Sequence, residues 1–135
     1  MKRGVLVVMC AALFAGFGSP AGAGEVNIKS RIEFRGNSFI QVILQKDLLK
    51  GPKWNIESGQ VCPLPLSKAV TAARTALEKV IPEAKTWIVY AVNLDSCGND
   101  RTRWYYFVNF ESPDDQNDVM VAVYLDGSAP AIEKK

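Results

Sequence analysis

The residues that most often carry out catalysis are missing from this chain. It contains no histidine, and histidine is the commonest general base, the usual partner of a nucleophilic serine or cysteine, and the commonest metal ligand. The glycine-rich phosphate-binding motifs and the G-x-S-x-G motif are also missing. Carboxylate pairs could act as glycosidase acid and base, but that chemistry usually occupies a cleft in a larger fold. We therefore predict that the protein is not an enzyme and uses no cofactor.

The acidic segment at residues 114–118 (DDQND) is the one candidate metal loop. Its oxygen-bearing side chains suit Ca²⁺, which is a hard cation. The segment lacks the spacing of an EF-hand and its distal glutamate, and acidic residues are also common in hairpin turns. We expect a solvated turn, with a weak calcium site as the alternative, and assign no metal ligand. Asn99 and Asp100 are interpreted in the same way, as turn residues beside Cys97.

The first 23 residues have the features of a secretory signal peptide. Lys2 and Arg3 precede an apolar run over residues 5–17, and small residues follow at 21–23 (AGA). The run is too short for the roughly 20 apolar residues that span a bilayer. We expect cleavage between Ala23 and Gly24, a secreted or periplasmic location, and no membrane span in the mature chain.

Cleavage would remove the excess of positive charge. Losing Lys2 and Arg3 brings the basic residues level with the 14 acidic ones. A neutral chain has no basic field to attract nucleic acid, so we predict no nucleic-acid partner. Residues 24–135 suit one compact domain.

Cys62 and Cys97 are the two cysteines of the expected mature chain. In an oxidising compartment an even pair favours one structural disulfide. The chain-entropy model gives such a bond about 3–4 kcal/mol of stabilisation. Redox chemistry would normally use a C-x-x-C motif, which is absent, and two free thiols are the remaining alternative.

Apolar residues that alternate with polar ones predict five strands. Gly36 and Asn37 are a turn signal, so the first two strands should form a hairpin with its turn near residues 35–38. Residues 48–60 look like an irregular connection that Trp54 and Ile56 anchor to the body. The predicted strands are residues 26–35, 39–45, 86–94, 103–111 and 119–125, with a further short extended piece at 131–132.

One amphipathic helix is predicted over residues 66–81, because apolar residues recur there every three or four positions. Ser67 is a natural N-cap and Pro82 a stop. Three small residues, Ala69, Ala73 and Ala76, would let the helix approach a sheet closely. The order of elements predicts an α+β fold: an N-terminal β-hairpin, and one helix packed on a three- to five-stranded antiparallel sheet.

The segment RWYYFVNF, residues 103–110, concentrates aromatic side chains in one strand. Strand alternation places Trp104, Tyr106, Val108 and Phe110 on one face, which we expect to pack under the helix. The opposite face is covered by the N-terminal hairpin or the Trp54 segment, or it is an exposed surface for a partner. The candidate partner-binding residues on that face are Trp87, Tyr105, Phe107 and Tyr124.

The second half of the chain, from residue 64 to about 132, resembles a PepSY-type domain. The resemblance rests on the helix start at residues 66–70 (LSKAV), continued by Ala73 and Leu77, and on a last strand that ends in an Asp-Gly turn at residues 123–127 (VYLDG). It implies a small, exported, non-catalytic module with a helix on an antiparallel sheet. Such modules are associated with restraining proteases or with binding other envelope proteins. The N-terminal hairpin and the two cysteines lie outside the usual pattern.

These observations predict an exported non-catalytic binding module, either protease-inhibitory or envelope-protein-binding, whose partner is another secreted or envelope protein. The alternative is a small-ligand carrier that resembles a cystatin- or NTF2-like cone. That carrier would have a pocket between helix and sheet, lined by Trp104, Tyr106 and Val70. A structural component without a discrete partner is a third interpretation.

Overall fold

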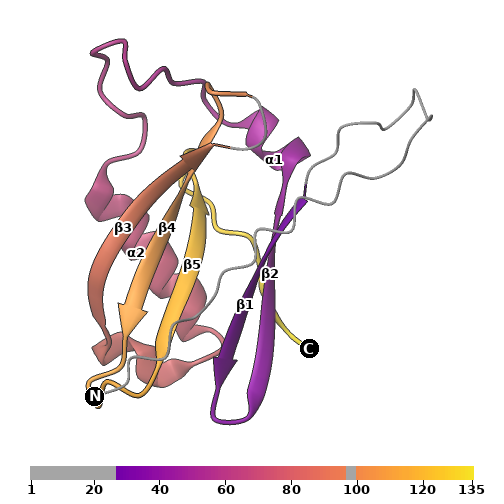
Figure 1. Cartoon of the computed structure of the whole chain (residues 1–135), viewed down its shortest axis with the longest axis vertical. Helices are drawn as coiled ribbons and strands as arrows, with labels where there is room; N and C mark the ends of the chain where they lie inside the picture. The colour runs from indigo at the N-terminus through magenta and orange to yellow at the C-terminus, as the bar shows by residue number, and fades with distance from the viewer. Residues whose placement is uncertain (1–26, 97–99) are drawn as a thin grey trace, which may run out of the picture.

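The computed structural model describes residues 27–96 and 100–135, and in these it has two antiparallel sheets and one main helix (Figure 1). The α+β class predicted from the sequence is confirmed. The strands are β1 (Asn27–Phe34), β2 (Asn37–Leu44), β3 (Ile88–Ser96), β4 (Trp104–Glu111), β5 (Asp118–Tyr124) and β6 (Ile132–Lys134). The helices are α1 (Gln45–Lys50), α2 (Leu66–Glu78) and the short 3₁₀ helix η1 (Pro82–Thr86).

The first sheet has the strand order β1-β2-β6 and is built on the predicted N-terminal hairpin. Phe34 pairs with Asn37, so the turn consists of Arg35 and Gly36, whose φ angles are 47° and 76°. Two consecutive residues with positive φ give a turn whose twist matches that of the flanking strands, which is why a glycine is favoured here. β6 pairs with the other edge of β2 and makes the hairpin a three-stranded sheet.

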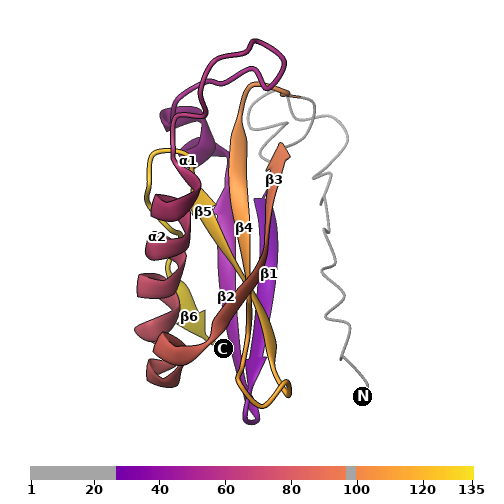
Figure 2. The ribbon, with the colours of Figure 1, turned by 90° about the vertical axis from the view of Figure 1, so that its left-hand side faces the viewer.

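The second sheet has the order β3-β4-β5, and α2 packs on one of its faces (Figure 2). Ala69, Ala73 and Leu77 are fully buried and lie along the inward side of the helix. The prediction of Ser67 as the N-cap is wrong. Pro65 occupies that position without a side-chain cap, because the helix begins two residues earlier than Ser67 capping requires. The helix also ends at Glu78, three residues before the predicted end.

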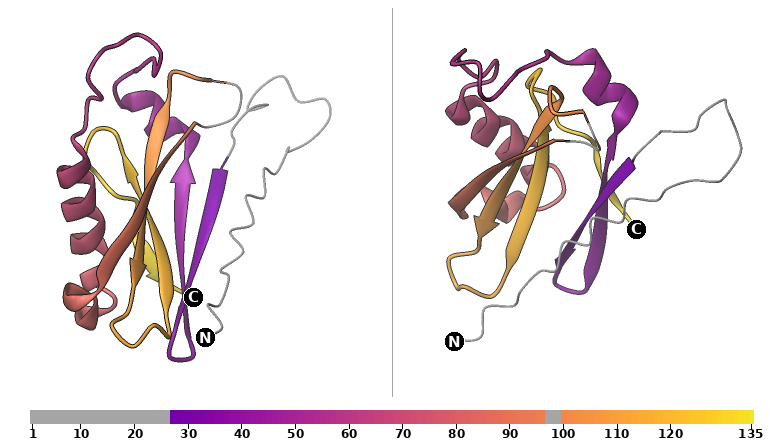
Figure 3. Two further views of the ribbon diagram at one scale, coloured as in Figure 1. Left: turned by 60° about the vertical axis from the view of Figure 1, so that its left-hand side comes forward. Right: turned by 45° about the horizontal axis from the view of Figure 1, so that its top comes forward.

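Strand β4 is buried on both of its faces. Tyr106, Val108 and Phe110 point into a core shared with α2, as the alternation predicted. Tyr105 and Phe107 point into a second core, closed by residues of the N-terminal hairpin and α1. Figure 3 shows the hairpin and α1 beside the second sheet. The second core contains Ile28, Ile43, Leu48, Tyr105, Phe107, Ala122 and Tyr124.

The two sheets meet along β5, which lies between β4 and the hairpin (Figure 1). At this junction the two sheets are joined by hydrogen bonds from side chains, and not by backbone pairing between the strands that the structure describes. Gln41 is fully buried, and its amide donates to the carbonyl of Ala122 (3.0 Å) while its carbonyl accepts from the amide N–H of Ala122 (2.8 Å). Ser30, directly opposite Gln41 in the hairpin register, donates to the carbonyl of Met120 (3.4 Å). The outer edge of β5 is thus covered and hydrogen-bonded, as a buried strand edge requires.

Candidate functional site

The four aromatic residues predicted to bind a partner are core residues in this structure. Trp87, Tyr105, Phe107 and Tyr124 are at most 5% exposed. The interpretation of this sheet face as an exposed binding surface is therefore wrong. The alternative, cover by the N-terminal hairpin, describes the structure, because Ile28 and Ile43 pack against the aromatic rings.

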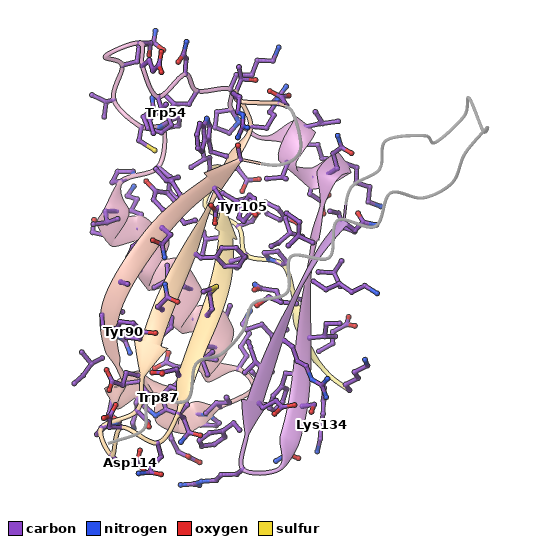
Figure 4. All side chains as sticks on the ribbon, viewed as in Figure 1. Trp54, Trp87, Tyr90, Tyr105, Asp114 and Lys134 are labelled. Atoms are coloured by element: carbon purple, nitrogen blue, oxygen red, sulfur yellow. The ribbon has the colours of Figure 1, made fainter. Side chains whose placement is uncertain are left out.

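The contacts of these side chains also explain why they are aromatic. The rings of Tyr105 and Phe107 meet edge to face with centroids 5.2 Å apart, and the hydroxyl of Tyr124 accepts from the amide of Leu44 (3.1 Å). Trp87 is on the other side of the sheet, where its ring meets Phe34 at 5.2 Å. Figure 4 shows Tyr105 near one end of the second sheet and Trp87 near the other end. The residues stabilise two separate cores and form no single surface.

The loop that connects α1 to α2, residues 51–65, stands out beyond the end of the second sheet (Figures 1 and 4). Its first half is held by Trp54, which is buried. The backbone amide of Trp54 donates to the carbonyl of Thr102 (2.9 Å), and its own carbonyl accepts from the indole of Trp104 (2.9 Å). The indole of Trp54 donates to the carbonyl of Gln60 (3.0 Å). The predicted anchoring role of Trp54 is thus confirmed.

The second half of the 51–65 loop is held by Tyr106. Its hydroxyl donates to the carbonyl of Leu64 (2.9 Å), and the thiol of Cys62 lies 3.1 Å from the same hydroxyl oxygen. Leu64 is itself buried. Burial raises the pKa of Tyr106 well above its ordinary value, and the thiol contact raises it further. A neutral hydroxyl is therefore kept as the donor that ties this part of the loop to β4.

Between these two attachments the loop exposes apolar side chains. Val61 is 90% exposed and lies between Gln60, held by Trp54, and Cys62, held by Tyr106. Ile56 is 51% exposed, so its predicted role as an anchor is wrong. The tip of the loop is a turn at Asn55. The side-chain oxygen of Asn55 accepts from the amide of Glu57, and its backbone carbonyl accepts from the amide of Ser58. The loop therefore presents Val61 to solvent from a backbone that the body of the protein fixes.

A groove of about 540 Å³ lies where the loop joins α2. The residues predicted to line a ligand pocket, Trp104, Tyr106 and Val70, do not line it, and they do not line a second groove of about 260 Å³ near η1. Tyr106 packs in the core instead. The first groove is lined by Pro63, Leu64, Pro65, Lys68, Thr71, Ala72, Leu125, Asp126 and Gly127.

The predicted disulfide involves a residue outside the part of the chain that the structure describes, namely Cys97. Cys62 is half-buried and carries a free thiol in this structure. The Cys62–Cys97 bond therefore stays a prediction.

The acidic residues in the loop between β3 and β4 and in the loop between β4 and β5 make turns. Asp114 accepts from the hydroxyl of Ser112 and the amide of Gln116, and these bonds lower the pKa of its carboxyl group. Asp100 accepts from the hydroxyl and amide of Thr102, with the same effect on its pKa. Among the residues described, no three histidine, cysteine or acidic side chains are grouped as metal ligands would be.

No protein-family model, curated protein or solved structure matches this chain. In the described ranges, no helix is both long enough and apolar enough to cross a membrane. The 51–65 loop is therefore defined as a candidate site by its own geometry. Sequence reasoning missed Val61, since a single valine in a polar loop has no periodicity that would mark it.

Proposed function

We propose that this protein is an exported, non-catalytic module that binds another secreted or envelope protein through the 51–65 loop. In this proposal Val61 enters an apolar pocket of the partner. The observation that carries the proposal is the 90% exposure of Val61 between two backbone carbonyls that the body of the protein binds, that of Gln60 by Trp54 and that of Leu64 by Tyr106.

The fixed backbone favours affinity, because binding restricts any loop that is mobile in the free protein and this restriction costs conformational entropy. A loop already held in one conformation loses less conformational entropy when it binds, so more of its contact energy appears as affinity. Full burial of a valine side chain contributes about 1.5–3 kcal/mol, which corresponds to roughly 10- to 150-fold in affinity. Ile56, which is also exposed in this loop, would add contact area.

The N-terminal sequence supports the exported location, and the PepSY resemblance of residues 64–132 supports a binding role. The resemblance also suggests which partners to examine first, because PepSY-type modules are associated with restraining proteases. The order of helix and strands in the second sheet is compatible with that family.

Affinity capture from envelope and culture-medium extracts tests the proposal. We expect Val61→Asp to reduce recovery of the partner at least tenfold, since an aspartate cannot enter an apolar pocket without losing hydration. Leu49→Asp is the matched control, because Leu49 is 50% exposed on α1 and lies outside the loop. Both variants should unfold at the same denaturant concentration as the wild type. Equal recovery by wild type and Val61→Asp would refute the role of the loop.

A further inference from the structure

The outer edge of β3 differs from the edge at the opposite side of its sheet. Gln41 and Ser30 cover the edge of β5 with hydrogen bonds. β3 pairs with β4 on one side, and no strand of the described ranges pairs with its other side. Unpaired strand edges carry backbone donors and acceptors that favour pairing with another strand.

β3 also lacks most of the features that keep strand edges apart. It is nine residues long, contains no proline or lysine, and has one charged residue, Asp95. A bulge between Val89 and Ala91 and the charge of Asp95 are the protective features of its edge. Ile88 is 60% exposed and Tyr90 is 51% exposed, and Figure 4 shows Tyr90 on the outer side of the sheet. Within the described ranges this edge has no strand partner, and its length and exposed apolar side chains suit it to an added strand.

We propose that the added strand is β3 of a second copy of this chain, in antiparallel orientation. The charges at the two ends of the edge select this arrangement. Asp95 is exposed near the C-terminal end of β3, and Lys85 is exposed in η1, just before its N-terminal end. Antiparallel pairing in the register that sets the two Tyr90 residues opposite each other brings Asp95 of each copy near Lys85 of the other, whereas parallel in-register pairing would bring the two Asp95 carboxylates together. The two three-stranded sheets would then form one continuous six-stranded sheet with two-fold symmetry.

This interface does not use Val61 and is independent of the function proposed for the 51–65 loop. It is also small, since it involves one strand and the side chains next to it. Interfaces below roughly 1,200 Å² are usually weak or transient. We therefore expect a reversible dimer with a dissociation constant in the micromolar range, roughly 1–100 µM.

Sedimentation velocity of the purified protein from about 1 to 200 µM, across that expected range, measures this equilibrium. We expect the average mass to approach that of a dimer. Tyr90→Lys should weaken association at least tenfold, because lysine on an open edge opposes strand pairing. Ile56→Lys, the same kind of change at a similarly exposed residue of the 51–65 loop, should leave the dimer unchanged. Folding of each variant is checked by its denaturation midpoint.

Charge reversal tests the orientation of the two strands. Asp95→Lys alone and Lys85→Asp alone should each weaken the dimer by roughly three- to tenfold, and the double variant should restore it. A dimer that tolerates Tyr90→Lys, or single reversals that the double variant does not rescue, would overturn the proposal. A wild-type chain that stays monomeric at every concentration would also overturn the proposal. This holds even if that monomer captures a different exported protein through Tyr90.

Discussion

Gln41 offers the most direct test of how the two sheets are joined. Its side chain is fully buried and makes three hydrogen bonds to main-chain atoms: two with Ala122 and one to the carbonyl of Pro130 (3.0 Å). Gln41→Met keeps nearly the same shape and removes all three bonds. Each intramolecular hydrogen bond contributes about 0.5–1.5 kcal/mol net, and buried groups left unpaired add to the loss. We therefore expect the free energy of unfolding to fall by about 3–4 kcal/mol, a large share of the total for a domain of this size.

Urea denaturation measures that loss, and amide hydrogen exchange locates it. The N–H of Ala122 points away from β4, since it donates to Gln41, whereas its neighbours Val121 and Val123 face β4 in the alternating antiparallel pattern. Gln41→Met should therefore accelerate exchange at Ala122 by local opening, more than at Val121 or Val123.

Gln60→Met is the matched control, because Gln60 is exposed and its carbonyl bond to Trp54 does not involve the side chain. We expect its unfolding free energy to stay within about 0.5 kcal/mol of the wild type. A loss below about 1 kcal/mol for Gln41→Met, with Ala122 exchanging as in the wild type, would contradict the conclusion that Gln41 joins the sheets.

Three further predictions concern residues around the 51–65 loop and the cores. Thiol labelling of the exported protein under denaturing conditions should find no free cysteine, and two labelled thiols would exclude the Cys62–Cys97 disulfide. Tyr106→Phe should lower the unfolding free energy by about 1–2 kcal/mol, because the carbonyl of Leu64 loses its donor; no change in urea denaturation would contradict this role of the hydroxyl. Burial raises the pKa values of Tyr106 and Tyr124 above the ordinary 10.0. The unfolded chain therefore loses these protons first, and stability that is complete below pH 10 should fall as the pH rises beyond it. Denaturation at a series of alkaline pH values checks this, and a double Tyr106→Phe/Tyr124→Phe variant should show a weaker dependence.

Much of the secondary structure followed from local patterns. Alternation identified the strands, the Gly36-Asn37 signal located the first hairpin, and the three-four spacing located α2. The division of the aromatic strand into two faces was also correct, because strand geometry alone decides which neighbours share a face. Errors at this level were the two short helices α1 and η1, which were not predicted, and the ends of α2, where Pro65 and not Ser67 occupies the N-cap.

The candidate site depended on information of another kind. Alternation showed that Tyr105 and Phe107 share a face but not what covers that face, since cover comes from β1 and β2 at the far end of the sequence. Two polar residues at inward hairpin positions, Ser30 and Gln41, were the available signal that this hairpin meets a strand edge. Their partners Met120 and Ala122 could not be named without the fold.

The sequence by itself therefore determined the class of fold, the faces of its strands and the absence of histidine chemistry, all of which depend on residue type and short-range spacing. The tertiary structure decided which surfaces are open. It closed the aromatic face with the hairpin, left the edge of β3 without a strand partner in the described ranges, and exposed Val61 from a loop held by Trp54 and Tyr106. Exposure is set by segments distant in sequence that pack together, and no local pattern contains that information.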